Sequence, residues 1–151
     1  MFKKILVSAI LGSTLIATGC QTMTSNQVSK AEKNNLALLQ DRTWVATQIN
    51  STAIDQNQSL PSLKFDSATK HVSGTDSCNQ LMGSYTATDS SLKFGNLAST
   101  RRLCMDNNNL DLSFNSALNQ VKSYKVTEKK LQLLNQNGQP VLEFNPMIQP
   151  R

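Results

Sequence analysis

The sequence has few of the residues from which catalytic and metal sites are usually built. Among its 151 residues there is one histidine, His71, and aromatic residues make up only 5%. A single imidazole excludes sites with several histidine ligands, and no Cys/His spacing typical of zinc is present. Lys and Arg number 15 against 10 Asp and Glu, a surplus too small and too scattered to indicate nucleic-acid binding. We therefore expect no metal, no cofactor and no nucleic-acid partner.

Catalytic sequence motifs are also weak. The Ser-x-x-Lys pattern of penicillin-binding enzymes occurs at Ser67–Lys70 and again at Ser90–Lys93. That chemistry needs the serine at the start of a helix, whereas both matches fall in predicted hairpins, and no Ser-Asp-Asn or Lys-Thr-Gly partner exists. The sequence has no Gly-x-Ser-x-Gly, its acidic residues are dispersed, and His71 lies on a strand that we expect to be exposed. These observations predict a protein that is not an enzyme.

Long apolar runs are absent except near the N-terminus. Residues 5–17 carry no charge and follow Lys3 and Lys4. As a helix this run would be about 20 Å long, shorter than the roughly 30 Å hydrocarbon layer of a bilayer. A basic start, a short apolar run and small residues after it are typical of a secretory signal peptide. We predict that residues 1–19 are this signal, with a buried N-terminal helix as the alternative.

Three cysteines are an odd number, so at least one serves outside an internal disulfide. The signal ends in Leu15-Ile16-Ala17-Thr18-Gly19-Cys20, which resembles the bacterial lipobox, although Ala17 stands where leucine is usual. The resemblance implies that Cys20 is lipidated and becomes the new N-terminus, with acyl chains such as palmitate for stable membrane attachment. Gln21, in place of aspartate, implies sorting to the outer membrane, on its periplasmic side. Ordinary signal cleavage that leaves Cys20 free is the alternative.

The remainder of the chain suits one domain. Residues 20–39 are expected to hold the lipidated cysteine, a polar tether and a short helix around 30–40, and residues 147–151 a loose tail. From Trp44 onward apolar residues alternate, and Asn137-Gly138 is a strong hairpin signal. The alternation predicts strands at 44–49, 63–65, 71–73, 84–87, 92–94, 124–127, 131–134 and 141–144.

One segment has helical spacing instead. Its apolar residues are Leu110, Phe114, Ala117, Leu118 and Val121. They predict an amphipathic helix at about 109–122, with Asn115 on its exposed side. The expected fold class is therefore α+β, a small antiparallel β-sheet, open and barrel-like, packed on this one amphipathic helix.

Two stretches form a distinctive pattern. Residues 74–85 read GTDSCNQLMGSY, and residues 97–104 read LASTRRLC. Together with an opening Trp44 and a leucine-rich hairpin that ends in Phe144, they resemble the META domain of HslJ-type heat-inducible bacterial lipoproteins. The resemblance covers about residues 40–146, and Ser77 departs from it because glycine often stands there. It implies a set of structural motif residues, namely Trp44, Asn79, Gly83, Tyr85, Ser99 and Thr100.

The motif also contains Cys78 and Cys104. In an oxidising compartment, and with Cys20 used for lipid, we predict that these two form a disulfide. Such a bridge would stabilise the domain by about 3.5 kcal/mol in the chain-entropy model, whereas two buried free thiols are the alternative. Asn79 is expected to bond the neighbouring backbone, Gly83 to allow a bulge or a close approach, and Thr100 to bond backbone rather than act as a nucleophile.

The family resemblance implies a role in envelope stress tolerance, since HslJ-type members are linked to heat shock and novobiocin resistance. The expected partner is the membrane, through the lipid anchor, with a lipid or an envelope protein as a candidate ligand. One alternative is a lipid- or protein-binding lipoprotein like the pilot lipoproteins of secretion systems. A further alternative is a periplasmic hydrolase or a protease inhibitor. A ligand-sized apolar cavity would favour the former, and a cleft joining His71 to an acid and a serine would favour a hydrolase.

Overall fold

A computed structural model describes residues 35–104 and 108–148 of the chain. The predicted signal peptide, Cys20 and the polar tether lie outside these residues. Within the two described ranges, no helix is both long enough and apolar enough to cross a membrane.

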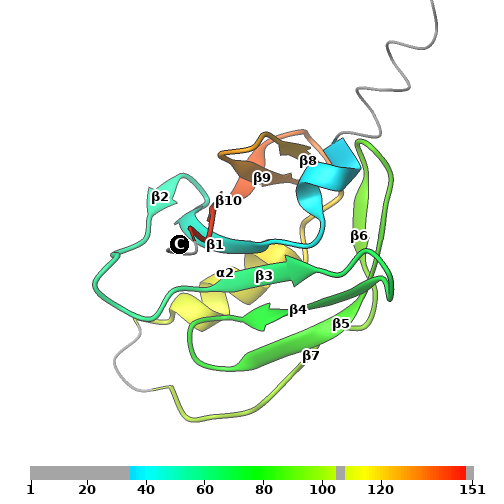
Figure 1. The fold of residues 1–151 in the computed structure, drawn as a ribbon. Coiled ribbons are helices and arrows are strands. Elements are labelled where there is room, and N and C mark those ends of the chain that lie inside the picture. Colours follow the sequence, from blue (N-terminus) through cyan, green and yellow to red (C-terminus); the bar gives the residue numbers. More distant parts are fainter. Residues whose placement is uncertain (1–34, 105–107, 149–151) are drawn as a thin grey trace, which may run out of the picture.

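The described residues form one ten-stranded antiparallel sheet (Figure 1). Its order is β6-β5-β4-β3-β1-β10-β9-β8, with β2 paired to β1 and β7 paired to β5. The strands are β1 (Thr43–Ile49), β2 (Thr52–Ala53), β3 (Ser62–Phe65), β4 (His71–Thr75), β5 (Gln80–Ala87), β6 (Leu92–Phe94), β7 (Ala98–Ser99), β8 (Ser123–Val126), β9 (Leu131–Leu134) and β10 (Pro140–Pro146).

The sheet curls until its two ends meet. A single bridge pairs Ser91, next to β6, with Ser123 at the start of β8. Two hydrogen bonds flank it: the Leu92 N–H donates to the Lys122 carbonyl (3.2 Å) and the Tyr124 N–H to the Ser90 carbonyl (3.3 Å). The fold is therefore a nearly closed, barrel-like antiparallel sheet, more complete than the open sheet expected from the sequence.

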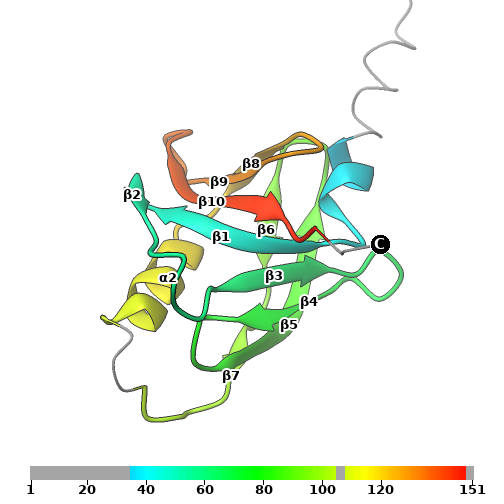
Figure 2. The same cartoon turned by 60° about the vertical axis from the view of Figure 1, so that its left-hand side comes forward.

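Two short helices lie at opposite ends of the barrel (Figure 2). One comprises residues 35–39, and the other is α2, Leu110–Leu118. The helix α2 is shorter than the predicted 109–122, because Gln120 and Val121 donate hydrogen bonds to carbonyls only three residues back, at Ala117 and Leu118. Val121 is buried as expected, but in the turn after the helix.

The period-two pattern located every predicted strand to within a few residues. It missed β2 and β7, which have two residues each, and the first half of β5. These segments show no alternation long enough to be recognised. The strands β2 and β7 are exposed and are held by pairing with a neighbouring strand, and the first half of β5 contributes one core residue, Leu81.

The interior of the barrel is filled by side chains from the strands and from α2. The largest fully buried ones are Trp44, Phe65, Tyr85, Phe114 and Phe144. The Phe65 ring meets the Tyr85 ring edge to face, with 5.1 Å between centroids, and the Phe114 ring meets that of Phe144 at 6.2 Å. A chain with few aromatic residues thus places most of them in one contiguous core.

Two buried tyrosines fasten hairpins to the core. The Tyr85 hydroxyl donates to the Asp66 carbonyl (2.9 Å) and accepts from Gln40 Nε2 (2.7 Å), while the Tyr124 hydroxyl donates to the Thr88 carbonyl (2.8 Å). Burial raises the pKa of Tyr85, and burial together with the nearby Asp89 charge raises the pKa of Tyr124 to about 12. Both rings therefore stay neutral donors well above neutral pH.

We expect α2 to carry a large part of the packing, and Phe114→Ala tests this. Deleting a fully buried phenylalanine should lower the free energy of unfolding by about 3–5 kcal/mol, measured by denaturant melts. The control is Leu112→Ala on the same helix, because Leu112 is 64% exposed. A loss at Phe114 no larger than about 0.5 kcal/mol, a surface-like value, would show that the helix is not a core element.

Candidate functional site

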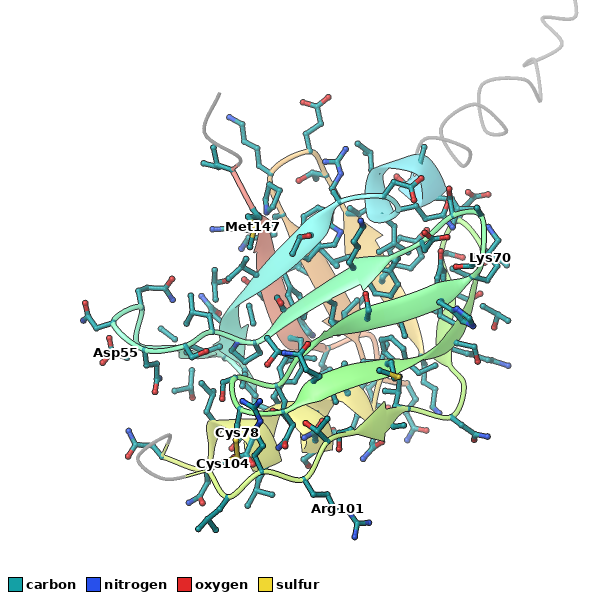
Figure 3. The ribbon with its side chains drawn as sticks, turned by 60° about the horizontal axis from the view of Figure 1, so that its bottom comes forward. Asp55, Lys70, Cys78, Arg101, Cys104 and Met147 are labelled. Carbon is teal, nitrogen blue, oxygen red and sulfur yellow. A yellow bond between two sulfur atoms is a disulfide. The ribbon has the colours of Figure 1, made fainter. Side chains whose placement is uncertain are left out.

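The two halves of the sequence motif meet at the turn between β4 and β5. A disulfide joins Cys78 in this turn to Cys104, with 5.9 Å between their Cα atoms, inside the range that a disulfide spans without strain. Figure 3 shows the two cysteines side by side at one end of the barrel, with Arg101 pointing away from the body of the molecule. The bond ties the segment that leads toward α2 to the sheet.

Asp76 organises the turn, and sequence reasoning missed it. Its side chain is almost completely buried. One carboxylate oxygen accepts hydrogen bonds from the backbone N–H groups of Cys78 (3.1 Å) and Asn79 (2.6 Å), and the other accepts from Asn115 Nδ2 of α2 (2.8 Å). A buried carboxylate needs such partners, so this residue fixes the turn and the helix relative to each other. The sequence feature that could have indicated this role is an aspartate three residues before the asparagine of a tight turn.

The sequence predicts that the Asn79 side chain bonds the neighbouring backbone, and this prediction is wrong. Its side-chain oxygen accepts from Thr100 Oγ1 (3.2 Å) and from the Arg102 backbone N–H (2.8 Å), more than twenty residues further along the chain. Its Nδ2 lies 3.6 Å from Cys104 Sγ. Asp76 performs the local task, which leaves the buried amide of Asn79 free to clamp the distant segment.

Thr100 bonds backbone, the role that the sequence indicated. Together with Asn79 and the Cys78–Cys104 disulfide it forms the group of contacts that we call the clamp. Its Oγ1 accepts from the Gln80 N–H (3.1 Å) and its own N–H donates to the Gln80 carbonyl (3.1 Å). Ser99, on β7, is exposed and pairs with Leu81 of β5. Segment 98–104 is thus held to the first half of β5 by strand pairing and by Thr100, and to the β4–β5 turn by Asn79 and the disulfide.

The other motif residues lie away from this clamp. Trp44 is buried on β1, and its Nε1 donates to the Leu39 carbonyl (2.9 Å) of the 35–39 helix. A Cβ added to Gly83 on β5 would lie 2.6 Å from the Asn96 carbonyl oxygen, so the chain between β6 and β7 packs closely against β5 there. Tyr85 fastens the β3–β4 turn, as described above. Each of these contacts is structural.

The chemistry available to the clamp is limited, because its polar atoms bond to one another. Exposed side chains around it are Arg101, Arg102 and Leu103. Within residues 35–104 and 108–148, no group of three His, Cys, Asp or Glu side chains gathers in a way that could hold a metal ion. His71 is exposed on β4, and the serines of both Ser-x-x-Lys matches lie in the β3–β4 and β5–β6 hairpins.

Cavities that open on the surface of the described residues include four with volumes of about 700, 450, 420 and 360 Å³. His71 lines none of these four. The cavity of 700 Å³ is bordered by Asp41, Arg42 and Met147, near the 35–39 helix, and the 420 Å³ cavity lies between the β6–β7 connection and the end of α2. These cavities are the candidate places for a ligand.

A family model settles the family of the chain. The META domain model matches residues 37–147. The chain belongs to the META domain family. The match includes both halves of the clamp and extends three residues before the start that the sequence suggested. Among curated protein sequences, none matches this META domain chain significantly.

Solved structures support the META domain fold. An NMR structure of a protein from Burkholderia xenovorans is similar with a TM-score of 0.61 and 23% identity, covering 99% of this chain and 100% of that one. A second protein solved by NMR is similar with a TM-score of 0.56 and 22% identity, covering 72% of this chain and 92% of that one. At these identities the similarity shows the fold alone.

The departure of this chain from the family at Ser77 should cost stability. Ser77 has a φ of 91°, where a side chain is strained, and its buried hydroxyl has no hydrogen-bond partner among the described residues. We expect Ser77→Gly to raise the free energy of unfolding by about 1 kcal/mol, measured by denaturant melts. Ser77→Ala, which removes the hydroxyl and keeps the backbone strain, should raise the free energy of unfolding by less. A less stable glycine variant would contradict this account.

Asn115 is not the neutral exposed position that helical spacing suggested, because it donates to buried Asp76. Asn115→Ala should leave one oxygen of that carboxylate without its donor and lower the free energy of unfolding by about 1–3 kcal/mol. Ser116→Ala, at the exposed next position of α2, is the matched control. Equal melts for the two variants would show that the bond contributes nothing.

Proposed function

We propose that this chain is a non-enzymatic lipoprotein of the bacterial envelope, held in the outer membrane on its periplasmic side by acylated Cys20. The observation that carries the proposal is the order of its parts. A segment that resembles a signal peptide ends in a lipobox-like sequence at Cys20, and a domain cross-linked by a disulfide follows. Disulfides persist in exported proteins and are rare in the cytosol, so the Cys78–Cys104 bond supports the same compartment.

For its biological role, we propose envelope stress tolerance of the HslJ type, including heat shock and novobiocin resistance. The support is the membership of the META family together with the resemblance of the motif to HslJ-type lipoproteins. The described residues also supply little for catalysis. The sole imidazole is exposed on β4, and the buried carboxylate of Asp76 is occupied by three donors.

The rival functions have less support. An acyl chain inside the barrel is disfavoured because that space is filled by Trp44, Phe65, Tyr85 and Phe144, all fully buried. A hydrolase would need a nucleophile, a base and a cleft in one place. Among the described residues, His71 lines none of the four cavities named above. Partner binding by the domain is compatible with the lipoprotein role and is taken up below.

The anchor is tested by Cys20→Ala in cells fed a palmitate analogue. The wild type should take up the label and sediment with membranes, whereas Cys20→Ala should do neither, because the thiol that accepts the lipid is gone. A Cys78→Ala/Cys104→Ala variant, which retains Cys20, should still be labelled. Equal labelling of the wild type and Cys20→Ala would overturn the anchor.

Cys20→Ala also tests the proposed role in envelope stress tolerance. In cells that lack the chain, the wild type should restore growth at high temperature and in novobiocin, and Cys20→Ala expressed at the same level should restore neither. Unchanged growth of the deficient cells under both stresses would contradict the stress function while leaving the anchor standing.

A further inference from the structure

The barrel is incompletely closed on one side. In Figure 2, β6 passes behind β1 and β3, and β8 lies near its upper end. They are joined at the Ser91–Ser123 bridge, but beyond it β6 continues to Phe94 while the opposite chain turns out of α2. The 420 Å³ cavity lies at this gap, which we call the seam. Its lining includes Lys93, Phe94 and Leu97 on one side and Leu118, Val121 and Lys122 on the other.

The backbone of Phe94 points into the seam. Gly95 donates to the Ser84 carbonyl of β5 (2.8 Å), whereas Leu92 donates in the opposite direction, to Lys122. Because backbone groups alternate along a strand, those of Phe94 share the direction of Leu92. On the β5 side, the N–H of Tyr85, which lies opposite Phe94, donates to Lys70 and so faces away from β6. No described residue bonds the Phe94 N–H or carbonyl across the seam.

Side chains around the seam also alternate. Phe94 is half-buried and its ring stacks on Phe65, with 6.1 Å between centroids, whereas the preceding Lys93 is exposed. Leu118 and Val121 on the far side are almost completely buried, so the accessible apolar floor is formed by Phe94 and Leu97. Lys122 adds a second exposed cation. No acidic side chain lines the cavity. The seam thus presents an apolar floor, a basic rim and an unpaired strand edge.

We propose that the seam binds an extended peptide segment, of alternating apolar and acidic residues, as an added strand on the edge of β6. A strand beside β6 pairs with the Phe94 N–H and carbonyl, which is the way exposed sheet edges capture peptides. Its alternate side chains reach the apolar floor, and the others lie outward beside Lys93 and Lys122, where carboxylates are favoured. The partner is therefore a protein segment, and binding does not depend on the lipid at Cys20.

A peptide fits the seam better than an amphipathic lipid. A fatty acid also offers a carboxylate for the lysines and an apolar chain for the floor. A carboxylate accepts but does not donate hydrogen bonds, however, so the Phe94 carbonyl gains no donor from it, and the Phe94 N–H competes with two lysines for its oxygens. The hydrogen bond at Phe94 separates the two ligands.

The experiment is an NMR titration of the purified, isotope-labelled full-length protein with an end-capped peptide of sequence Val-Glu-Val-Glu-Val-Glu. Peptide should shift the Phe94 amide resonance and slow its hydrogen exchange by about tenfold or more, because it gains an acceptor. The same peptide with lysine in place of glutamate should bind at least about tenfold more weakly, since it meets Lys93 and Lys122. Palmitate, added alone, should leave Phe94 exchange unchanged.

Variants locate the site. Lys93→Glu/Lys122→Glu should lower the affinity for the acidic peptide by about tenfold or more and raise the affinity for the basic peptide. The matched control, Lys125→Glu/Lys129→Glu, makes the same change in net charge at exposed positions that do not line the seam, and it should change affinity much less. No shift at millimolar peptide, binding without protection of Phe94, equal loss in both variants, or protection of Phe94 by palmitate would each overturn the proposal.

Discussion

The structure depends on the link between the β4–β5 turn and segment 98–104. The disulfide from Cys78 to Cys104 supplies the covalent part, and Asn79, with its bonds to Thr100 and Arg102, supplies the directional part. A crosslink alone would restrict the unfolded chain without choosing a register. The hydrogen bonds choose the register, and Asp76 then ties the same turn to α2 through Asn115. Two distant segments and one helix are thereby fixed by four polar side chains.

This link also explains why the barrel has a seam. The strand β5 pairs with β6 along its second half and with β7 along its first half, both on the edge opposite β4, and the register shifts by one residue between them. Gly83 makes this irregularity possible, because any side chain there would collide with the Asn96 carbonyl. Segment 98–104 stays on β5, where the clamp holds it, and does not extend the pairing of β6 with β8. The open edge of β6 is therefore a consequence of the motif that stabilises the domain.

The sequence was informative wherever one residue pattern determines local structure. Period-two alternation located the strands, Asn137-Gly138 located a hairpin whose Gly138 has a φ of 73°, and the clamp brings together the motif residues Asn79, Thr100 and the two cysteines. It failed where the deciding contact is distant. The asparagine of a turn and the asparagine on a polar helix face look local and exposed in sequence, yet Asn79 and Asn115 both bond across the fold. Closure of the sheet was likewise invisible, since it depends on one bridge between residues 32 positions apart.

The distribution of polar groups limits how such a domain acts. The buried polar residues Gln40, Asp76 and Asn79 bond within the fold, so their side chains are unavailable to a substrate. Besides the enclosed Ser77 hydroxyl, unsatisfied hydrogen-bonding capacity remains on the backbone at the Phe94 edge, beside two cations and an apolar floor. A surface of that kind recognises chain conformation and charge pattern rather than a reactive group. Such a surface fits the proposed membrane-tethered domain, because backbone pairing, charge and apolar contact recognise a protein segment without a reactive group.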